Sequence, residues 1–251
     1  MKRPISLGLA PNLEKKDALS ALSYLFQPWK YLHGSSTTKL SEWFKKYYDV
    51  PYAYSFSSAR GGMYALFKAL GLKSSDEVII QAFTCKAVVE PILAAGLTPI
   101  YADINKNFTF SEDDLLKKIT PRTKVVVFQH TFGIPNINID LIKKLQSKNI
   151  FIIEDLAHGI GIVGKGEKLG TFGDAAVFSF GRDKAFSSVS GGMVITKNEK
   201  IGNALGEFYK NKPFPSLFWT FQQLFHSVCF YLLILPLYDT AKIGKIFLVL
   251  F

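Results

Sequence analysis

Cysteine is scarce in this chain: only Cys85 and Cys229 occur among its 251 residues. Two cysteines make no disulfide framework, and their spacing is not that of a metal-binding motif. No long apolar run follows the basic start at Met1–Arg3, as it would in a secretory signal peptide. We therefore expect no metal site and a reducing, cytoplasmic setting.

Acidic residues are outnumbered, since 30 lysines and arginines stand against 20 aspartates and glutamates, for a formal net charge of +10. Such an excess suits nucleic acid, an anionic membrane or anionic small molecules. Most lysines, however, come in pairs on expected helices, such as Lys45–Lys46 and Lys143–Lys144. No basic stripe with interleaved aromatics occurs, so we expect solvated helix faces and no nucleic-acid partner.

Internal repeats and low-complexity segments are also absent, and 48% of the residues are hydrophobic, enough for a large core. Short apolar runs alternate with segments of helical spacing. The expected strands are 78–80, 99–102, 124–128, 150–153, 175–180 and 193–196, and the expected helices between them are 61–70, 87–95, 112–119 and 139–146. This alternation predicts an α/β fold with a mainly parallel sheet and flanking helices.

Three parts are expected along the chain. Residues 1–55 read as an N-terminal arm with helices at Asp17–Phe26 and Ser41–Tyr48, residues 56–200 as the α/β domain, and residues 201–251 as an apolar tail. In α/β sheets of this kind the ligand lies at the carboxyl ends of the strands. Residues that follow the expected strands are therefore the first candidates for a site.

Within the tail, Leu217 to Tyr238 is dense in Phe, Leu and Ile, and Ile246 to Phe251 is apolar again. Polar residues and a proline interrupt it, namely Gln222, Gln223, His226 and Pro236. A membrane-spanning helix needs about 20 apolar residues with few breaks, so we do not expect one. Three interpretations stay open: the start of a truncated C-terminal region, an amphipathic segment on a membrane surface, and an apolar tail docked on a partner.

Two residues that follow strands form the most informative pair. The run 150–153 ends in Glu154–Asp155, and Lys184 follows the strand 175–180. Enzymes that use pyridoxal phosphate (PLP) need such a pair: the lysine holds the aldehyde as a Schiff base, and the carboxylate keeps the pyridine nitrogen protonated. Taken singly, each residue would be a loop lysine or a helix-capping aspartate. The joint pattern predicts a PLP site.

A phosphate site is expected at Ser57–Gly62, where small residues precede a helix whose first N–H groups can bind an anion. Within it Ser58, Ala59 and Arg60 are candidate cofactor-binding residues, although Ser58 suits a simple N-cap equally well. Ser179 is either a second phosphate ligand or a satisfied buried serine.

Three further features near the pair have alternative interpretations. His158 is either structural or lies beside the cofactor ring and bonds its phenolic oxygen. Gly191–Gly192 is either a turn or leaves room for substrate or a partner subunit. Arg182 pairs either with an anionic substrate or with Asp183.

Several segments resemble those of the DegT/DnrJ-type sugar aminotransferases, which are PLP enzymes of the aspartate aminotransferase fold. The similarity covers roughly residues 34–200, and the segments around Asp155 and Lys184 are its most specific parts. The matching segments are 57–72, 76–79, 83–84, 120–124, 130–133, 153–159, 173–176 and 178–196.

The resemblance implies a role for each candidate. Lys184 is the Schiff-base lysine, Asp155 the pyridinium partner, and His158 the residue beside the ring hydroxyl. The phosphate is implied to lie between Ser179 and the amides around Ala59–Arg60.

Two departures from the family pattern stand out. Ala59–Arg60 replaces a common Gly-Thr pair, and Cys85 replaces an aromatic that stacks on the cofactor. The family's smaller C-terminal domain is not recognisable before Phe251. Weaker cofactor affinity or a different stack would follow from these departures.

The resemblance implies transfer of an amino group from an amino acid, by analogy glutamate, to a keto-sugar that is nucleotide-linked. It also implies a homodimer. A PLP sugar dehydratase is a rival, but relatives with that chemistry have histidine in place of Lys184. A second rival is a non-catalytic or membrane-associated protein that retains the fold. We expect a cytoplasmic protein, with peripheral contact to a membrane through the tail.

Overall fold

The computed structural model describes residues 12–237, apart from the side chains of Leu32, His33 and Leu237. The chain divides into two compact units. The first unit comprises Met1–Thr38, Phe180–Gly191 and Pro213–Phe251, and the second comprises Lys39–Ser179 and Gly192–Lys212. The three-part division expected from the sequence stays a prediction.

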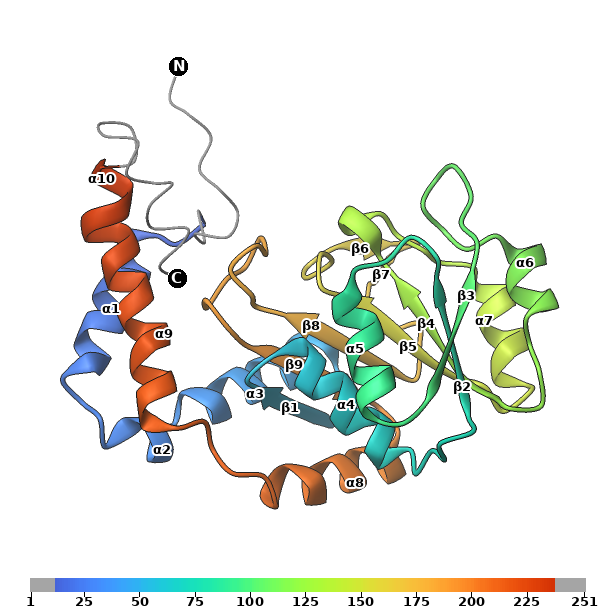
Figure 1. Cartoon of the computed structure of the whole chain (residues 1–251), viewed down its shortest axis with the longest axis horizontal. Helices are drawn as coiled ribbons and strands as arrows, with labels where there is room; N and C mark the ends of the chain where they lie inside the picture. The colour runs from blue at the N-terminus through green and yellow to red at the C-terminus, as the bar shows by residue number, and fades with distance from the viewer. Residues whose placement is uncertain (1–11, 238–251) are drawn as a thin grey trace. The chain divides into compact units, whose positions relative to one another are not determined.

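The second unit is built on a seven-stranded sheet with the order β1-β9-β8-β5-β4-β2-β3 (Figure 1). Its strands are β1 (Tyr52–Phe56), β2 (Glu77–Gln81), β3 (Thr98–Ala102), β4 (Thr123–Gln129), β5 (Phe151–Leu156), β8 (Ala175–Ser179) and β9 (Gly192–Thr196). Neighbouring strands from β3 to β8 run parallel, and only β9 is antiparallel to β8 and β1. The predicted α/β class and mainly parallel sheet are confirmed.

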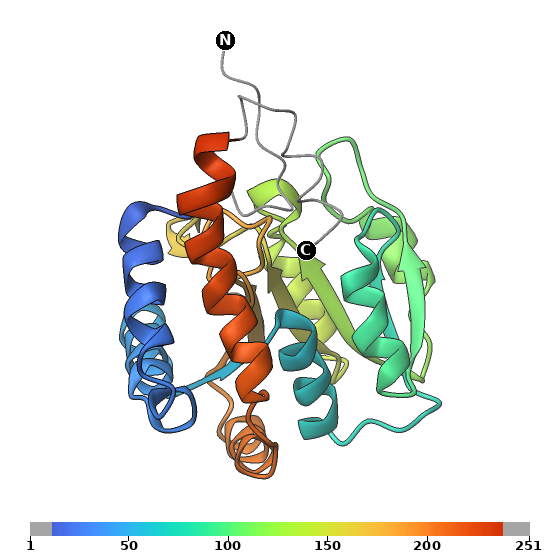
Figure 2. The ribbon, with the colours of Figure 1, turned by 60° about the vertical axis from the view of Figure 1, so that its left-hand side comes forward.

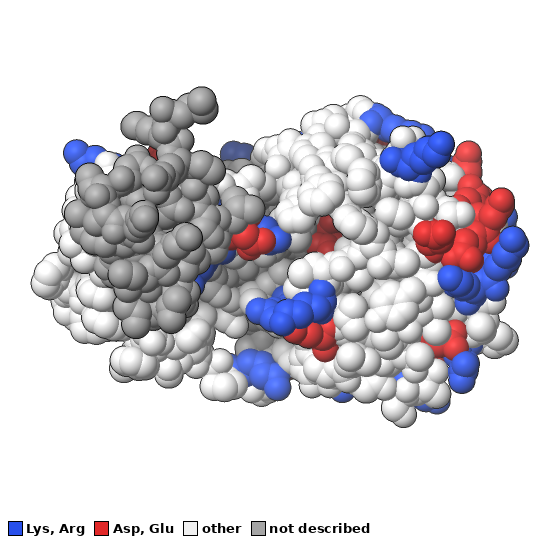
Figure 3. Space-filling model, turned by 45° about the horizontal axis from the view of Figure 1, so that its top comes forward, with Lys and Arg blue, Asp and Glu red and all other residues white. Residues whose placement is uncertain are grey.

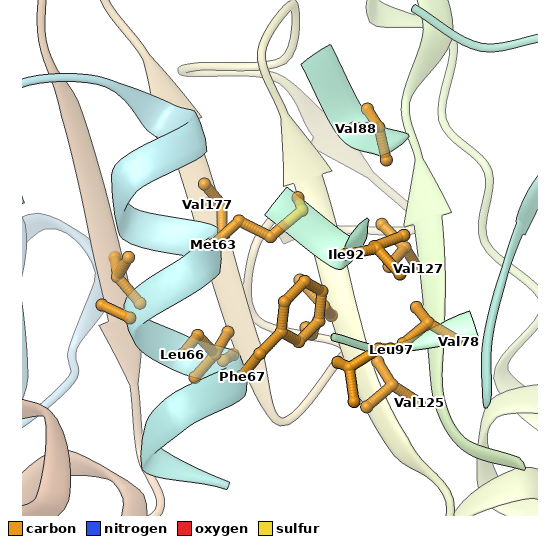
Figure 4. Packing of buried hydrophobic residues seen from close by; sticks show 14 of the residues in the cluster. Met63, Leu66, Phe67, Val78, Val88, Ile92, Leu97, Val125, Val127 and Val177 are labelled. Atoms are coloured by element: carbon orange, nitrogen blue, oxygen red, sulfur yellow. The ribbon is translucent and has the colours of Figure 1, made fainter. Parts of the chain in front are cut away.

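Helices cover both faces of this sheet and bury its apolar strands. One face lies under α4 (Ala59–Ala69), α5 (Lys86–Ala94) and α8 (Glu199–Lys210), and the other under α6 (Glu112–Lys117) and α7 (Ile139–Gln146). The close-up in Figure 4 shows Met63, Leu66 and Phe67 of α4 directed at the strands. Phe44 of α3 (Ser36–Tyr48) packs edge-on against Phe178.

In the seven-stranded sheet, two strands differ from the sequence expectation in more than the position of an end residue. β1 lies inside the segment read as an irregular arm, and it completes the sheet by pairing antiparallel with β9. Its burial pattern is mixed, so it lacks the continuous apolar run that marks the central strands. β5 is longer than expected and extends through Leu156, so Asp155 lies within the strand and not after it.

In the first unit, α1 (Lys15–Leu25) packs side by side with α9 (Leu217–Cys229), as Figures 1 and 2 show. The unit also holds α2 (Lys30–His33). After α9 the helix continues as one π-helical segment, Phe230–Ile234, and then as α10 (Leu235–Leu237).

The polar residues and Pro236 therefore do not interrupt the helix, contrary to the sequence expectation. By length and composition alone, residues Leu217–Ile234 meet the requirement for a membrane-spanning helix, a test that buried core helices also pass. The remainder of the tail, residues 238–251, lies outside the described part of the chain.

Two adjacent glycines of α4 provide a test of this packing. A Cβ at Gly62 would lie 2.7 Å from Val194 Cγ2, whereas a Cβ at Gly61 would meet only Ser58 Oγ, at 3.5 Å. We expect Gly62→Ala to lower the free energy of unfolding by about 1–3 kcal/mol, because the buried valine must shift. The matched variant Gly61→Ala should change it by less than about 1 kcal/mol. Urea unfolding followed by circular dichroism measures both, and equal effects would contradict the close approach of α4 to β9.

Candidate active site

Three polar side chains extend one apolar face of the sheet at its carboxyl edge. Val127 of β4, Ile153 of β5 and Val177 of β8 belong to the core cluster under α4 and α5. Side chains in a strand alternate between faces with a period of two. Gln129, Asp155 and Ser179, each two residues further on, therefore lie on the same face as that core.

The register brings the first two of these residues together. Gln129 pairs with Asp155 across the parallel strands β4 and β5. Asp155 is 7% exposed, and its Oδ1 accepts a hydrogen bond from the Ala157 N–H at 3.0 Å. Its backbone carbonyl accepts from the His130 N–H at 3.1 Å. The carboxylate is thus held at the strand end by its own turn and by the neighbouring strand.

Glu154 points to the opposite face and is 1% exposed. Its Oε1 accepts hydrogen bonds from the N–H groups of Phe172, at 2.8 Å, and Gly173, at 2.7 Å. Its Oε2 accepts from the Gly170 N–H at 2.8 Å and lies 3.0 Å from His130 Nε2. A buried carboxylate needs such donors to offset its lost hydration.

The tautomer of His130 follows from these contacts. His130 Nδ1 accepts a hydrogen bond from the Asn136 N–H at 3.0 Å, so the ring proton lies on Nε2 and is donated to Glu154. Sequence reasoning assigned no role to Glu154 or His130. The available signal was an acidic residue inside an apolar strand, which requires buried partners.

His158 follows β5 in a turn and is exposed. Its Nδ1 accepts a hydrogen bond from the Phe132 N–H at 3.2 Å, and the two rings stack with centroids 6.0 Å apart. Phe132 has a φ of 55°, in the left-handed region, which turns its N–H toward His158. The contact fixes the His158 proton on Nε2, away from Phe132. Whether this proton meets a cofactor hydroxyl stays a prediction.

The candidate phosphate site forms at the start of α4. Ser58 is its N-cap, and Ser58 Oγ accepts from the Gly61 N–H at 3.1 Å, so the capping interpretation is confirmed. The N–H groups of Ala59 and Arg60 occupy the first two helical positions, which have no acceptor within a helix. A positive helix end with such donors suits an anion.

Gly192 joins Ser179 to this helix start. Ser179 and Gly192 are register partners in β8 and β9. A Cβ on Gly192 would lie 2.4 Å from the Ala59 N atom, so this glycine lets the first turn of α4 reach the strand. This close approach to Ala59 is enough to explain why residue 192 is a glycine, so no contact with substrate or a partner subunit is needed to explain it. The structure thereby gathers Ser179 and Ser58–Arg60 around one point.

Arg60 and Cys85 are the residues at which the sequence departs from the pattern that the resemblance implies, and the structure shows where each side chain lies. The Arg60 guanidinium lies 2.6 Å from Glu90 Oε2 on α5, and the pair is about half exposed. Cys85 is exposed and immediately precedes α5, where a β-region backbone makes it the N-cap residue.

Lys184 lies in the loop Phe180–Gly191, which belongs to the first unit. Its side chain is 16% exposed, and Nζ lies 3.0 Å from Asp183 Oδ2. Within the same unit the Lys184 N–H donates to the Gly181 carbonyl, at 3.1 Å, and the Lys184 carbonyl accepts from Asn12 Nδ2, at 3.0 Å. The carboxylate of Asp183 thus holds Lys184. By chain connectivity the loop begins after Ser179 and ends before its register partner Gly192.

The buried Tyr48 and the half-buried Asp174 support the segments that flank β5 and precede β8. Burial raises the pKa of Tyr48 to about 12, so its hydroxyl stays neutral where it meets the Gly161 N–H, 3.5 Å away. Burial also raises the pKa of Asp174, whose carboxylate accepts from the Ile152 N–H and from Gln146. These contacts tie α3 to the turn after β5, and they tie α7 and β5 to the loop before β8.

Comparison with known proteins identifies relatives of this arrangement. The model of the DegT/DnrJ/EryC1/StrS aminotransferase family matches residues 12–211. The chain is 33% identical to GDP-perosamine synthase of Escherichia coli O157:H7, over 76% of this chain and 53% of that protein. It is 31% identical to the spore coat polysaccharide biosynthesis protein SpsC of Bacillus subtilis, over 78% of this chain and 50% of that protein. The chain thus spans about half the length of these curated relatives.

Solved structures with a similar fold include sugar aminotransferases as well. DesI, crystallised with its TDP-sugar product, is 27% identical with a TM-score of 0.73, over 85% of this chain and 55% of that one. The PLP form of Spr1654, described as a putative sugar aminotransferase of Streptococcus pneumoniae, is 26% identical with a TM-score of 0.72, over 84% and 56%.

Glu154 provides a test of the site's framework. Glu154→Gln removes the buried charge and turns an amide N–H2 toward groups that are themselves donors. We expect the free energy of unfolding to fall by about 3 kcal/mol or more. The matched variant Glu167→Gln lies on the short strand β7 (Glu167–Lys168), where the side chain is exposed, and it should change this free energy by less than about 0.5 kcal/mol. Denaturant unfolding measures both, and a Glu154→Gln variant as stable as Glu167→Gln would contradict the role of this carboxylate.

Proposed function

The chain belongs to the DegT/DnrJ/EryC1/StrS aminotransferase family, and on that premise we propose that it transfers an amino group to a sugar with PLP as cofactor. The finer proposal is that an amino acid, glutamate, donates the group to a nucleotide-linked keto-sugar. The observation that carries the proposal is the row of Gln129, Asp155 and Ser179 on one sheet face, with the start of α4 next to Ser179.

The residues of this face fit PLP. Gln129 is 7% exposed, and its Oε1 has no hydrogen-bond partner in the described chain, although it neighbours Asp155 at the carboxyl edge. A buried acceptor without a partner is costly, and a polar ligand at this edge would supply a donor. The helix start beside Ser179 offers N–H groups to a phosphate.

PLP supplies an electron sink for the carbanion that forms when a proton leaves the amino donor. We propose that Asp155 keeps the ring nitrogen protonated through its carboxylate. The N–H groups of Ala59 and Arg60, with Ser58 and Ser179, would hold the phosphate, and His158 would lie beside the ring hydroxyl.

Lys184 would hold the cofactor through Nζ until the amino group of the donor displaces it, and the freed Lys184 amine would then move the proton. Its Nζ takes the proton from the α-carbon of the amino donor as general base. It later returns a proton to the sugar carbon that receives the amino group, now as general acid. The resemblance implies that related dehydratases have histidine at the position of Lys184. Because this chain has lysine there, we propose an aminotransferase and not a dehydratase.

The assembly and location remain proposals. We propose a homodimer by analogy with the fold family. We also propose a cytoplasmic enzyme that contacts a membrane surface through its C-terminal helix, since Leu217–Ile234 is apolar enough to interact with lipid. A membrane-associated protein that retains the fold without catalysis is the second candidate, and the same helix favours it.

The role of Lys184 has a direct test. After incubation with PLP and reduction with borohydride, peptide mapping should find the cofactor's mass on Lys184. Lys184→Ala should lose this label, whereas Lys197→Ala, at an exposed lysine after β9, should keep it. A folded, PLP-loaded protein labelled elsewhere or not at all would contradict the proposal.

Asp155→Asn separates cofactor binding from catalysis. Asparagine preserves the shape but cannot hold the charge on the ring nitrogen, so the loss falls on the transition state. We expect kcat to fall by roughly a hundredfold or more while KM changes by less than about tenfold. The exposed residue Asp140 on α7 provides the matched control, Asp140→Asn, which should behave as wild type. Equal turnover in Asp155→Asn and wild type would exclude Asp155 as the ring partner.

A further inference from the structure

A pocket of about 610 Å³ opens on the sheet face opposite to Asp155, between the loop before α6, the start of α7 and the β6–β7 hairpin (Val163–Gly164 and Glu167–Lys168). Its lining comprises Asn105, Thr109, Phe110, Ser111, Glu112, Asp113, Asn136, Ile137, Asn138, Leu141 and Lys165. We propose that this pocket binds a neutral, hydroxyl-rich small molecule of the sugar class. The inference does not depend on the proposed aminotransferase activity.

The floor of the pocket is apolar and preformed. Phe110 and Leu141 are buried members of the core cluster under α6 and α7, and Ile137 lies beside them in the lining. The volume falls within the range of about 300–1,000 Å³ found for small-molecule sites. An apolar floor with polar walls suits a sugar, whose C–H groups and hydroxyls point in different directions.

Asn136 supplies a buried donor that lacks an acceptor. The residue is 4% exposed, and its backbone N–H donates to His130 Nδ1, as described above. Its side-chain Nδ2 has no hydrogen-bond partner in the described chain. An unpaired buried donor carries a free-energy cost. A ligand oxygen that reached this amide would remove the cost, and this is the strongest indication of a ligand.

The acceptors on the rim include one that is held in place. Glu112 Oε2 accepts from Asn138 Nδ2 at 3.0 Å, and Asn138 Oδ1 accepts from the Leu141 N–H at 3.1 Å as the N-cap of α7. The Glu112 carboxylate is thereby oriented from the start of α7, with Oε1 outside this bond. The neighbouring Asp113 carboxylate is exposed and has no hydrogen bond or ion pair with another described residue.

The lining also includes a cation. Lys165 stands at the tip of the β6–β7 turn, with a φ of 50°, and its ammonium makes no ion pair within residues 12–237. On the side of the loop before α6, Asn105 Nδ2 donates to Thr109 Oγ1 at 2.6 Å, which leaves the threonine hydroxyl able to donate.

The balance of these charges selects the ligand class. Two carboxylates repel phosphates and carboxylates, and the ammonium repels amines. Hydroxyl groups both donate and accept, so a neutral polyol satisfies the carboxylates, the ammonium and the Asn136 amide together. Figure 3 shows acidic and basic side chains gathered together at the end of the molecule that bears α6, and not a field of one sign.

Titration of the ¹⁵N-labelled full chain tests the proposal through the side-chain N–H2 signal of Asn136. This signal is identified by its absence in Asn136→Ser, which retains the backbone N–H bonded to His130. Glucose, galactose and mannose are the neutral probes, and glucose 6-phosphate and glutamate are the charged ones. We expect a neutral hexose to shift the signal saturably, with a Kd of about 1–10 mM. The exposed amide of Asn211, which bonds to Glu207, should stay unshifted in the same spectra.

Two variants tie the response to the pocket. Asp113→Asn and Glu112→Gln should each weaken hexose binding roughly tenfold, the worth of a hydrogen bond to a charged group. The control Asp140→Asn, on the same helix as Leu141 but outside the lining, should bind as wild type. Asp155→Asn should also bind the hexose normally, which separates this site from the proposed catalytic one.

Three results would overturn the proposal. The first is no saturable shift of the Asn136 signal with any hexose up to about 100 mM, tenfold above the expected Kd. The second is a stronger response to glucose 6-phosphate or to glutamate, which would assign the pocket to anions or to zwitterions. The third is hexose binding that Asp113→Asn and Glu112→Gln leave unchanged.

Discussion

The buried carboxylate of Glu154 organises this protein's candidate site. A charge that is 1% exposed is tolerable only when donors surround it, and here three backbone N–H groups and His130 do so. These contacts bind the end of β5 to the segment before β8 and to the turn after β4. Because Asp155 is the next residue in the chain, its position depends on the same network.

The alternation of side chains along β5 explains how two adjacent carboxylates have different roles. Glu154 stabilises the fold, and Asp155 is a candidate catalytic residue. Glu154 and Asp155 are adjacent, so they must face opposite sides of the sheet. Glu154 enters the side covered by α6 and α7, where it is fully paired. Asp155 faces the side of α4 and α5, where Gln129 and Ser179 also end their strands. A shift of β5 by one residue would exchange the two carboxylates.

The start of α4 owes its position to a glycine far away in sequence. Gly192 has no side chain to keep Ala59 away from β9, and its register partner is Ser179. Ala59–Arg60 departs from the Gly-Thr pair that the resemblance implies at this point, yet the backbone N–H groups at this helix start are present. Arg60 is engaged by Glu90 on α5. The substitution therefore alters the side-chain contacts at this point and leaves the helix end in place.

The sequence by itself determined the α/β class, the central strands and most helices, because short apolar runs and helical spacing indicate locally which residues are buried. α7, for example, has the predicted bounds, Ile139–Gln146. The pairing of Asp155 with Lys184 as candidates also came from the sequence, whereas their roles remain proposals.

Only the tertiary structure decided the rest. β1 is recognised only by its pairing with β9. The helix continues through Pro236, although proline usually ends a helix. The backbone donors around Glu154 come from a segment 16 to 19 residues further along the chain. Hydrogen bonds and close contacts between distant residues leave no periodic pattern in a sequence, so they become visible only when the chain is folded.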